Sequence, residues 1–197
     1  MMKHQGKFIV MSLEEFEQWL SSKIVIRKIA LIQQHHTFIP NYRHFNSSRD
    51  SVHFKLLESM ERSHKERGFA EIGQNFTTFP DGTIGVCRDI NIAPAGIKGA
   101  NQFGICIEHI GNFDTKGDTM TQEQRETIIK MNALLCQKFK LTPNSKTIVY
   151  HHWYDLNTAK RTNGTGTTKS CPGSNFFGGN TVEAAEKNFI PLIKEAI

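Results

Sequence analysis

The chain has 197 residues, of which 38% are hydrophobic and 22% are charged, and it contains fourteen phenylalanines. This composition is typical of one folded domain and excludes a disordered chain. No apolar run approaches the roughly 18 residues that a membrane-spanning helix needs, so no such helix is predicted. The net charge of +5 would suit a polyanionic partner, but the basic residues are scattered and identify none.

The chain contains four cysteines, which are widely spaced and form no Cys-x-x-Cys motif: Cys87, Cys106, Cys136 and Cys171. The N-terminal apolar run Phe8–Met11 is too short for the core of a signal peptide, and acidic residues soon follow it. We therefore expect reduced thiols in a cytoplasm, where one cysteine can serve as a metal ligand instead of forming a disulfide.

The first half of the chain alternates helices with strands. Ser12 and Glu15 form a capping-box pattern at the start of a helix over residues 13–20, and residues 28–34 predict a strand that ends at His35. Beyond it we predict a loop over 41–48, a helix over 51–67 with Gly68 as its C-cap, and strands over 76–79 and 83–88 around the turn Pro80-Asp81-Gly82.

The second half continues the alternation. A strand is predicted over residues 104–110, and a second capping box, Thr121 to Gln124, opens a helix whose apolar stripe runs to Phe139. There follow a strand over 147–150, a Gly-, Thr- and Asn-rich loop over 155–179, and a last helix from Thr181 to Ile197 that kinks or breaks at Pro191. This order predicts an α/β fold: a single domain with a central mixed β-sheet flanked by helices.

Two of the predicted strands end in the same dipeptide, His35-His36 and His151-His152. Cys171 follows His151 by twenty residues, in a Cys-Pro-Gly turn. One imidazole from each pair and this thiolate would suit zinc, which leaves a fourth position open in catalytic sites. Paired histidines are also ordinary polar residues at loop mouths. Their recurrence at strand ends, together with the cysteine, favours a metal cleft at this edge of the sheet.

Six pieces of sequence then carry a resemblance to a known family. In order they are His35-His36-Thr37, Gly68 to Phe76, Asp81-Gly82-Thr83-Ile84, Gly104-Ile105 through Gly111-Asn112-Phe113, His151 at a strand end, and Lys169-Ser170-Cys171-Pro172-Gly173. With these pieces the chain resembles zinc-dependent N-acetylmuramoyl-L-alanine amidases, of the superfamily that includes peptidoglycan recognition proteins and amidase-type phage endolysins. The pieces extend over residues 29–177, most of the chain.

The resemblance implies that Zn²⁺ is held by His35, His151 and Cys171, because the first histidine of each pair is normally the ligand in this family. His36 and His152 are the alternatives, with contacts to the ligands or to the cleft wall as their other role.

The resemblance also implies catalytic residues. Lys169 matches a basic residue that stabilises the oxyanion. Glu108 matches a carboxylate that serves as general base when positions are counted back from Gly111, whereas counting forward from Gly104 places Cys106 there instead. Gln74 stands where many relatives have a tyrosine that donates its hydroxyl, and Gln cannot act as an acid.

The function implied is hydrolysis of the amide bond between N-acetylmuramic acid and L-alanine in peptidoglycan. The alternative is a peptidoglycan-binding module without turnover. A His-Glu-x-x-His zinc peptidase motif is absent from the sequence, and so is any nucleic-acid-binding motif. Further substrate contacts are suggested at Asn101, Trp153, Tyr154 and residues 162–168.

We expect residues 1–28 to form an N-terminal helical extension and residues 29–197 to form the amidase catalytic domain. Because Ile197 provides no stop signal, we expect the natural chain to continue, for example into a wall-binding domain. The partner expected is bacterial peptidoglycan, with no nucleic acid and no membrane insertion. Without a signal-peptide core, the protein would stay in the cytoplasm until its release to the cell wall, as a phage endolysin does.

Overall fold

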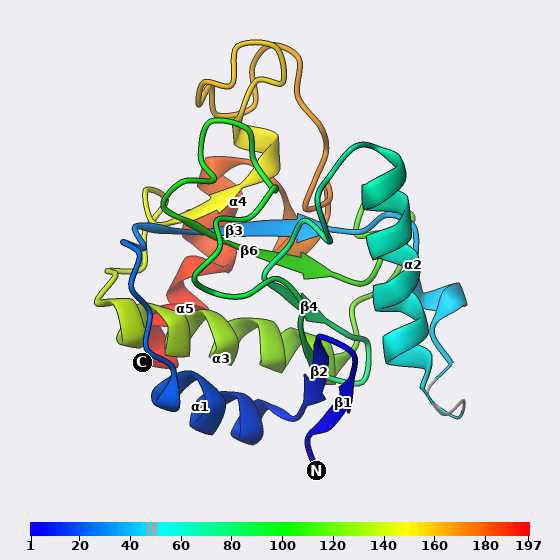
Figure 1. Ribbon diagram of the computed structural model, residues 1–197. Helices are drawn as coiled ribbons and strands as arrows, with labels where there is room; N and C mark the ends of the chain where they lie inside the picture. The colour runs from blue at the N-terminus through cyan, green and yellow to red at the C-terminus, as the bar shows by residue number, and fades with distance from the viewer. Residues whose placement is uncertain (47, 49–50) are drawn as a thin grey trace.

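The computed structural model describes residues 1–46, 48 and 51–197, and in them a single seven-stranded sheet has the order β1-β2-β5-β4-β6-β3-β7 (Figure 1). The strands are β1 (Lys3–Gln5), β2 (Phe8–Met11), β3 (Leu31–His36), β4 (Phe76–Thr78), β5 (Ile84–Val86), β6 (Gly104–His109) and β7 (Ile148–Tyr150). The helices are α1 (Leu13–Ser22), α2 (Val52–Glu66), α3 (Gln122–Phe139), α4 (Val182–Asn188) and α5 (Ile190–Glu195).

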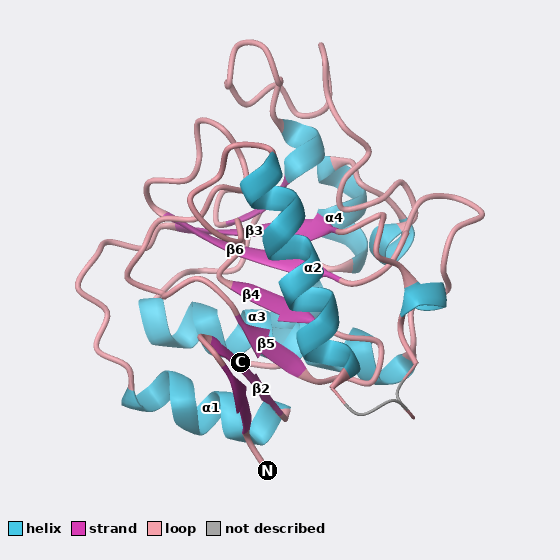
Figure 2. Cartoon of the chain, turned by 45° about the vertical axis from the view of Figure 1, so that its right-hand side comes forward, coloured by secondary structure: helices cyan, strands magenta, loops and turns pink. Residues whose placement is uncertain are grey.

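The sheet is mixed. Strands β4, β6, β3 and β7 are parallel neighbours, whereas β1, β2 and β5 pair antiparallel. Helix α2 lies in front of the sheet in Figure 2, with α1 and α3 behind it. This single α/β domain with helices on both faces of a mixed sheet confirms the fold predicted from the sequence.

Each face of the sheet has its own apolar core. On the α2 side, Phe8 and Val10 of β2 pack with Leu57 of α2. The opposite core takes Met11 from the same strand and Phe16 of α1, together with the apolar side chains of α3 and α5. Alternate residues of β2 therefore go to opposite faces, as the period of a strand requires. No helix in the described part of the chain is both long and apolar enough to cross a membrane.

The N-terminal hairpin was not predicted. Residues 1–28, expected to be a helical extension, also contain β1 and β2, and β2 pairs with β5 in the register Ile9 to Val86. A run as short as Phe8–Met11 carries too little periodicity to identify a strand whose partner lies some 75 residues along the chain. The predicted helix of this segment is present as α1, and its Ser12–Glu15 capping box is formed.

Two other helix boundaries can be compared with their predictions from the sequence. The last predicted helix divides at Phe189 into α4 and α5, with Pro191 in the first turn of α5, which confirms the predicted break. The second capping box is only half formed. The Thr121 hydroxyl accepts a hydrogen bond from the backbone N–H of Gln124 at 3.2 Å. The Gln124 side chain does not bond back to the Thr121 backbone. Its amide donates to the carbonyls of Thr78 (3.1 Å) and Ile110 (3.0 Å), and so ties α3 to the ends of two strands.

The remaining boundaries shift by a few residues. Strand β3 begins at Leu31, three residues later than predicted, and includes His35 and His36. The loop predicted over 41–48 contains a 3₁₀ turn at Tyr42–His44, and its residue 47 lies outside the described residues. Helix α2 ends at Glu66, with Gly68 in a left-handed conformation (φ +86°) shortly after, as the predicted C-cap requires.

Candidate metal centre

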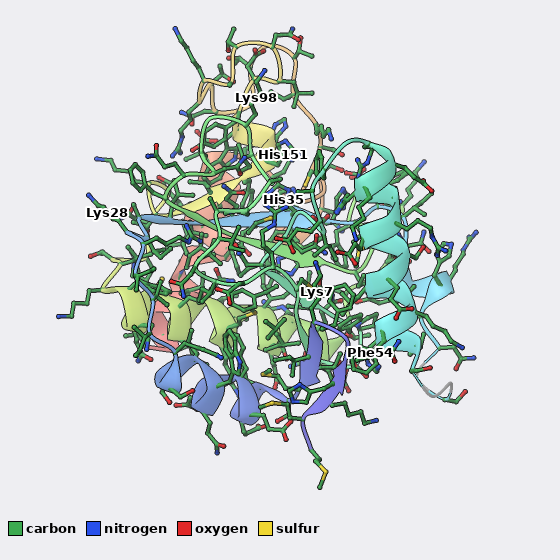
Figure 3. The ribbon with its side chains drawn as sticks, viewed as in Figure 1. Lys7, Lys28, His35, Phe54, Lys98 and His151 are labelled. Carbon is green, nitrogen blue, oxygen red and sulfur yellow. The ribbon has the colours of Figure 1, made fainter. Side chains whose placement is uncertain are left out.

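Three side chains from separate parts of the sequence meet where the parallel strands end. His35 is the penultimate residue of β3, His151 directly follows β7, and Cys171 comes from the long loop before α4. Their ligand atoms all lie within 4.8 Å of one another, and His35 Nδ1 is 3.5 Å from Cys171 Sγ. Figure 3 labels the two histidines close to each other. Their ring centroids are 4.7 Å apart. Because β3 and β7 are parallel neighbours, their carboxyl ends deliver both imidazoles to one edge of the sheet.

The chemistry of this cluster fits a metal ion. His35 is only 4% exposed, and burial lowers its pKa well below the usual value. Burial likewise lowers the pKa of His151 to about 4, so both imidazoles are neutral, which is the form that binds metals. Cys171 is also buried. Two neutral imidazoles and one thiol form a donor set that suits zinc and leaves one coordination position open.

The loop that carries Cys171 is fixed by a glycine. Gly173 has φ +120°, and a Cβ at this position would lie 2.4 Å from the backbone carbon and oxygen of Phe113. Asp114 holds the same loop, because its carboxylate accepts hydrogen bonds from the Ser170 hydroxyl (2.9 Å) and the Ser174 backbone (2.8 Å). Sequence reasoning missed Asp114, although it directly follows the Gly-Asn-Phe piece of the family pattern.

We expect Gly173→Ala to lower the free energy of unfolding by about 2–5 kcal/mol, from left-handed strain and from the clash with Phe113. Zinc affinity should fall as well, because the strained turn carries Cys171. Urea unfolding and zinc titration measure the two effects. Gly6→Ala is the matched control, since Gly6 also has a positive φ (+58°) but nothing within 4 Å of a built Cβ. Equal losses in the two variants would contradict the clash.

The alternative ligands, His36 and His152, lie outside the cluster. The ring nitrogen Nδ1 of His36 accepts a hydrogen bond from the backbone of Phe113 at 3.1 Å. His152 binds the cysteine loop twice: its backbone N–H donates to the Cys171 carbonyl (2.7 Å) and its Nδ1 donates to the Lys169 carbonyl (2.7 Å). His152 therefore positions the segment that carries both Lys169 and Cys171.

We expect His152→Ala to weaken zinc binding by ten- to a hundredfold, which is typical when a group that orients a ligand is lost. His152→Asn should recover most of the affinity, because the Asn amide can donate from nearly the place of Nδ1. Zinc competition with a chromogenic chelator measures both variants. Weak binding in both variants would show that the ring itself, rather than its hydrogen bond, is needed.

The cluster opens into a cavity of about 760 Å³, one wall of which is helix α2. Glu108 and Lys169 also line this cavity. Glu108 lies opposite His35 in the β3–β6 ladder, and burial raises the pKa of its carboxyl to about 8 against the opposing charge of Lys169. Cys106, two residues earlier on β6, is 1% exposed and is not among the lining residues.

Gln74 lies at the cavity wall with its amide already engaged. Its Nε2 donates to the Thr77 hydroxyl at 3.0 Å, while its Oε1 is buried with no partner among the described residues. The amide group that Gln74 has in place of the tyrosine hydroxyl is therefore directed at a neighbouring side chain.

The suggested substrate contacts outside this set do not line the cavity. Trp153 is fully buried, and its indole N–H donates to the Asn180 carbonyl at 2.7 Å, so it is a core residue. Asn101 accepts a hydrogen bond from the Gly96 backbone, and neither Tyr154 nor residues 162–168 belong to the cavity wall. His64 and Arg67 also line the cavity, and they were not predicted from the sequence. Their spacing is that of any solvent-exposed helix face, so it gave no signal of a site.

Comparison with known proteins gives this arrangement its family. The model of the N-acetylmuramoyl-L-alanine amidase family Amidase_2 matches residues 26–174. The chain therefore belongs to this family. The endolysin of Klebsiella phage KP32 is 30% identical over 98 residues, which are 49% of this chain and 63% of the endolysin. The chain thus spans less than two thirds of that relative.

Solved structures show the same fold. The N-acetylmuramoyl-L-alanine amidase LysC from Clostridium intestinale is 25% identical, with a TM-score of 0.55 over 76% of this chain and 80% of LysC. Wild-type Drosophila PGRP-LB is 20% identical, with a TM-score of 0.61 over 84% of each chain. At that identity PGRP-LB supports the fold alone.

Proposed function

We propose that this protein is a zinc-dependent amidase that hydrolyses the bond between N-acetylmuramic acid and L-alanine in bacterial peptidoglycan. The observation that carries the proposal is the cluster of His35, His151 and Cys171 at the floor of a cavity that Glu108 also lines. Membership of the amidase family and the likeness to LysC support the choice of substrate bond.

His35, His151 and Cys171 would hold the zinc ion. When bound, zinc supplies a Lewis acid that polarises the scissile carbonyl and favours ionisation of water. Glu108 takes a proton from the attacking water on its carboxylate and returns it to the leaving nitrogen of L-alanine. The high pKa of this carboxyl suits both transfers near neutral pH. Lys169 donates to the oxyanion of the tetrahedral species, a contribution worth roughly 3–4 kcal/mol for a well-placed donor.

The alternative is a peptidoglycan-binding module without turnover, and the engaged amide of Gln74 is the observation that favours it. Gln74 cannot act as an acid where many relatives have a tyrosine, and its amide is directed at Thr77 and Met60. We propose turnover nevertheless, because Glu108 and Lys169 together provide the proton transfer and the oxyanion donor. The division at residue 28 into an extension and a catalytic domain, and action at the cell wall after release from the cytoplasm, belong to the same proposal.

The test is the release of new L-alanine amino termini from purified peptidoglycan. We expect release by the purified protein, its loss after chelation, and its return when zinc is added back. Peptidoglycan that is bound by the zinc-loaded protein without any new termini would replace the enzyme with the binding module.

A further inference from the structure

A second set of metal-ligating side chains adjoins the first. Ligand atoms of His35, Cys106 and Glu108 all lie within 4.8 Å of one another. Strands β3 and β6 are paired with His35 opposite Glu108, and Cys106 precedes Glu108 by two residues. Residues two apart on a strand share a face, so the thiol and the carboxylate lie on the side of the sheet that carries His35.

The two nitrogens of the His35 ring have different surroundings. Nδ1 lies 3.5 Å from Cys171 Sγ, in the first set. Nε2 is buried and has no hydrogen-bond partner in the described part of the chain, and leaving a buried polar atom unpaired is costly. A Cβ added to Gly96 would lie 3.1 Å from this Nε2 and 2.8 Å from Cys106 Sγ. The same Cβ would lie 2.2 Å from Gln33 Oε1, so the backbone of Gly96 packs closely against this nitrogen and thiol and leaves no room for a side chain.

We propose that His35 Nε2, Cys106 and Glu108 form a second binding site for a soft divalent cation such as Zn²⁺ or Cd²⁺. Nitrogen, sulfur and carboxylate oxygen are the donors that zinc takes in proteins. Glu108 lines the cavity, which provides the route of entry, and the Cys106 thiol releases its proton to solvent when the cation binds. Both sites share His35, so when both are filled its ring loses the remaining N–H proton to solvent and bridges the two cations as an imidazolate.

One consequence rests on the proposed function. A cation in the second site occupies the carboxylate that serves as general base. Zinc in excess of one equivalent should therefore inhibit the release of L-alanine, and Cys106→Ala should relieve this inhibition by at least about tenfold in inhibitory zinc concentration.

Binding is tested with Cd²⁺ and the ultraviolet absorption of the thiolate–cadmium bond, a readout that needs no activity. Cys171→Ala disables the first set, so any thiolate–cadmium absorption that remains reports another cysteine. We expect this variant to bind one Cd²⁺ with that absorption, and the Cys106→Ala/Cys171→Ala double variant to lose it. The double variant Cys136→Ala/Cys171→Ala is the matched control, because Cys136 of α3 is buried in the apolar core, and it should keep the absorption.

The proposal is overturned if Cys171→Ala shows no thiolate–cadmium absorption, or if the absorption survives the loss of Cys106. Circular dichroism checks that each variant is folded. If the double variant does not fold, Glu108→Gln in the Cys171→Ala background replaces it, with an expected ten- to hundredfold loss of Cd²⁺ affinity, and unchanged affinity there overturns the proposal too. Failure of the wild type to release L-alanine would refute the amidase function and leave these binding results intact.

Discussion

Replacing Cys171 with serine should abolish the release of L-alanine and lower zinc affinity by at least about a hundredfold, with the fold unchanged. Loss of an outer contact to a metal ligand already costs ten- to a hundredfold in affinity, and loss of a ligand should cost at least the upper end of that range. Zinc binds cysteine as the thiolate, and a serine hydroxyl does not ionise in its place. The substitution replaces the sulfur atom by oxygen and changes the side-chain volume very little.

Zinc content by mass spectrometry and alanine release should therefore fall together in Cys171→Ser. Cys136→Ala is the control for loss of a thiol as such, since Cys136 is as buried as Cys171 but packs in the apolar core. It should keep its zinc and its activity. If Cys171→Ser retained full zinc affinity, the ligand set proposed from His35, His151 and Cys171 would be wrong.

Sequence alone placed the two histidines in one site because their positions follow from local rules. His35 and His151 each come at the end of an apolar run, and the ends of parallel strands meet at one edge of a sheet. Cys171 has no such rule, since a loop of some twenty residues separates it from β7. Its inclusion depended on the chemistry of zinc and on the family pattern, and Gly173 with its contact to Phe113 is what fixes it in space.

Features that depend on contacts between distant segments could not be predicted. The pairing of β2 with β5, and the hydrogen bonds of Gln124 to the ends of β4 and β6, join residues far apart in the chain. Local propensity carries no information about such partners, which packing selects. The amide of Gln74 is a local case, because its partner Thr77 follows three residues later, and sequence periodicity does not indicate which way the amide turns.

The lining of the cavity distinguishes the two candidates for the proposed general base. Two counts along the sequence left Glu108 and Cys106 as alternatives for the general base, and both residues face the same side of β6. Of the two, only Glu108 lines the cavity, which Lys169 lines as well. Burial that raises a carboxyl pKa to about 8 also brings it near the pH at which a base both takes and gives up a proton efficiently.

Glu108→Gln should therefore lower kcat for alanine release by about 10²–10⁴-fold, the usual contribution of a general acid–base residue. The amide has nearly the shape of the carboxylate but cannot take the proton of water. One equivalent of zinc should remain bound, because Glu108 lies outside the first ligand set, and KM should change far less than kcat.

Glu17→Gln is the matched control, because Glu17 is exposed on α1, and it should leave kcat unchanged. Steady-state kinetics on soluble muropeptides, with zinc content measured on the same samples, separates the two effects. If the Glu108→Gln variant turned over at the wild-type rate, another group and not Glu108 would be the general base. A slow variant that had also lost its zinc would make Glu108 a residue that helps to hold the metal, because loss of the base alone leaves His35, His151 and Cys171 in place.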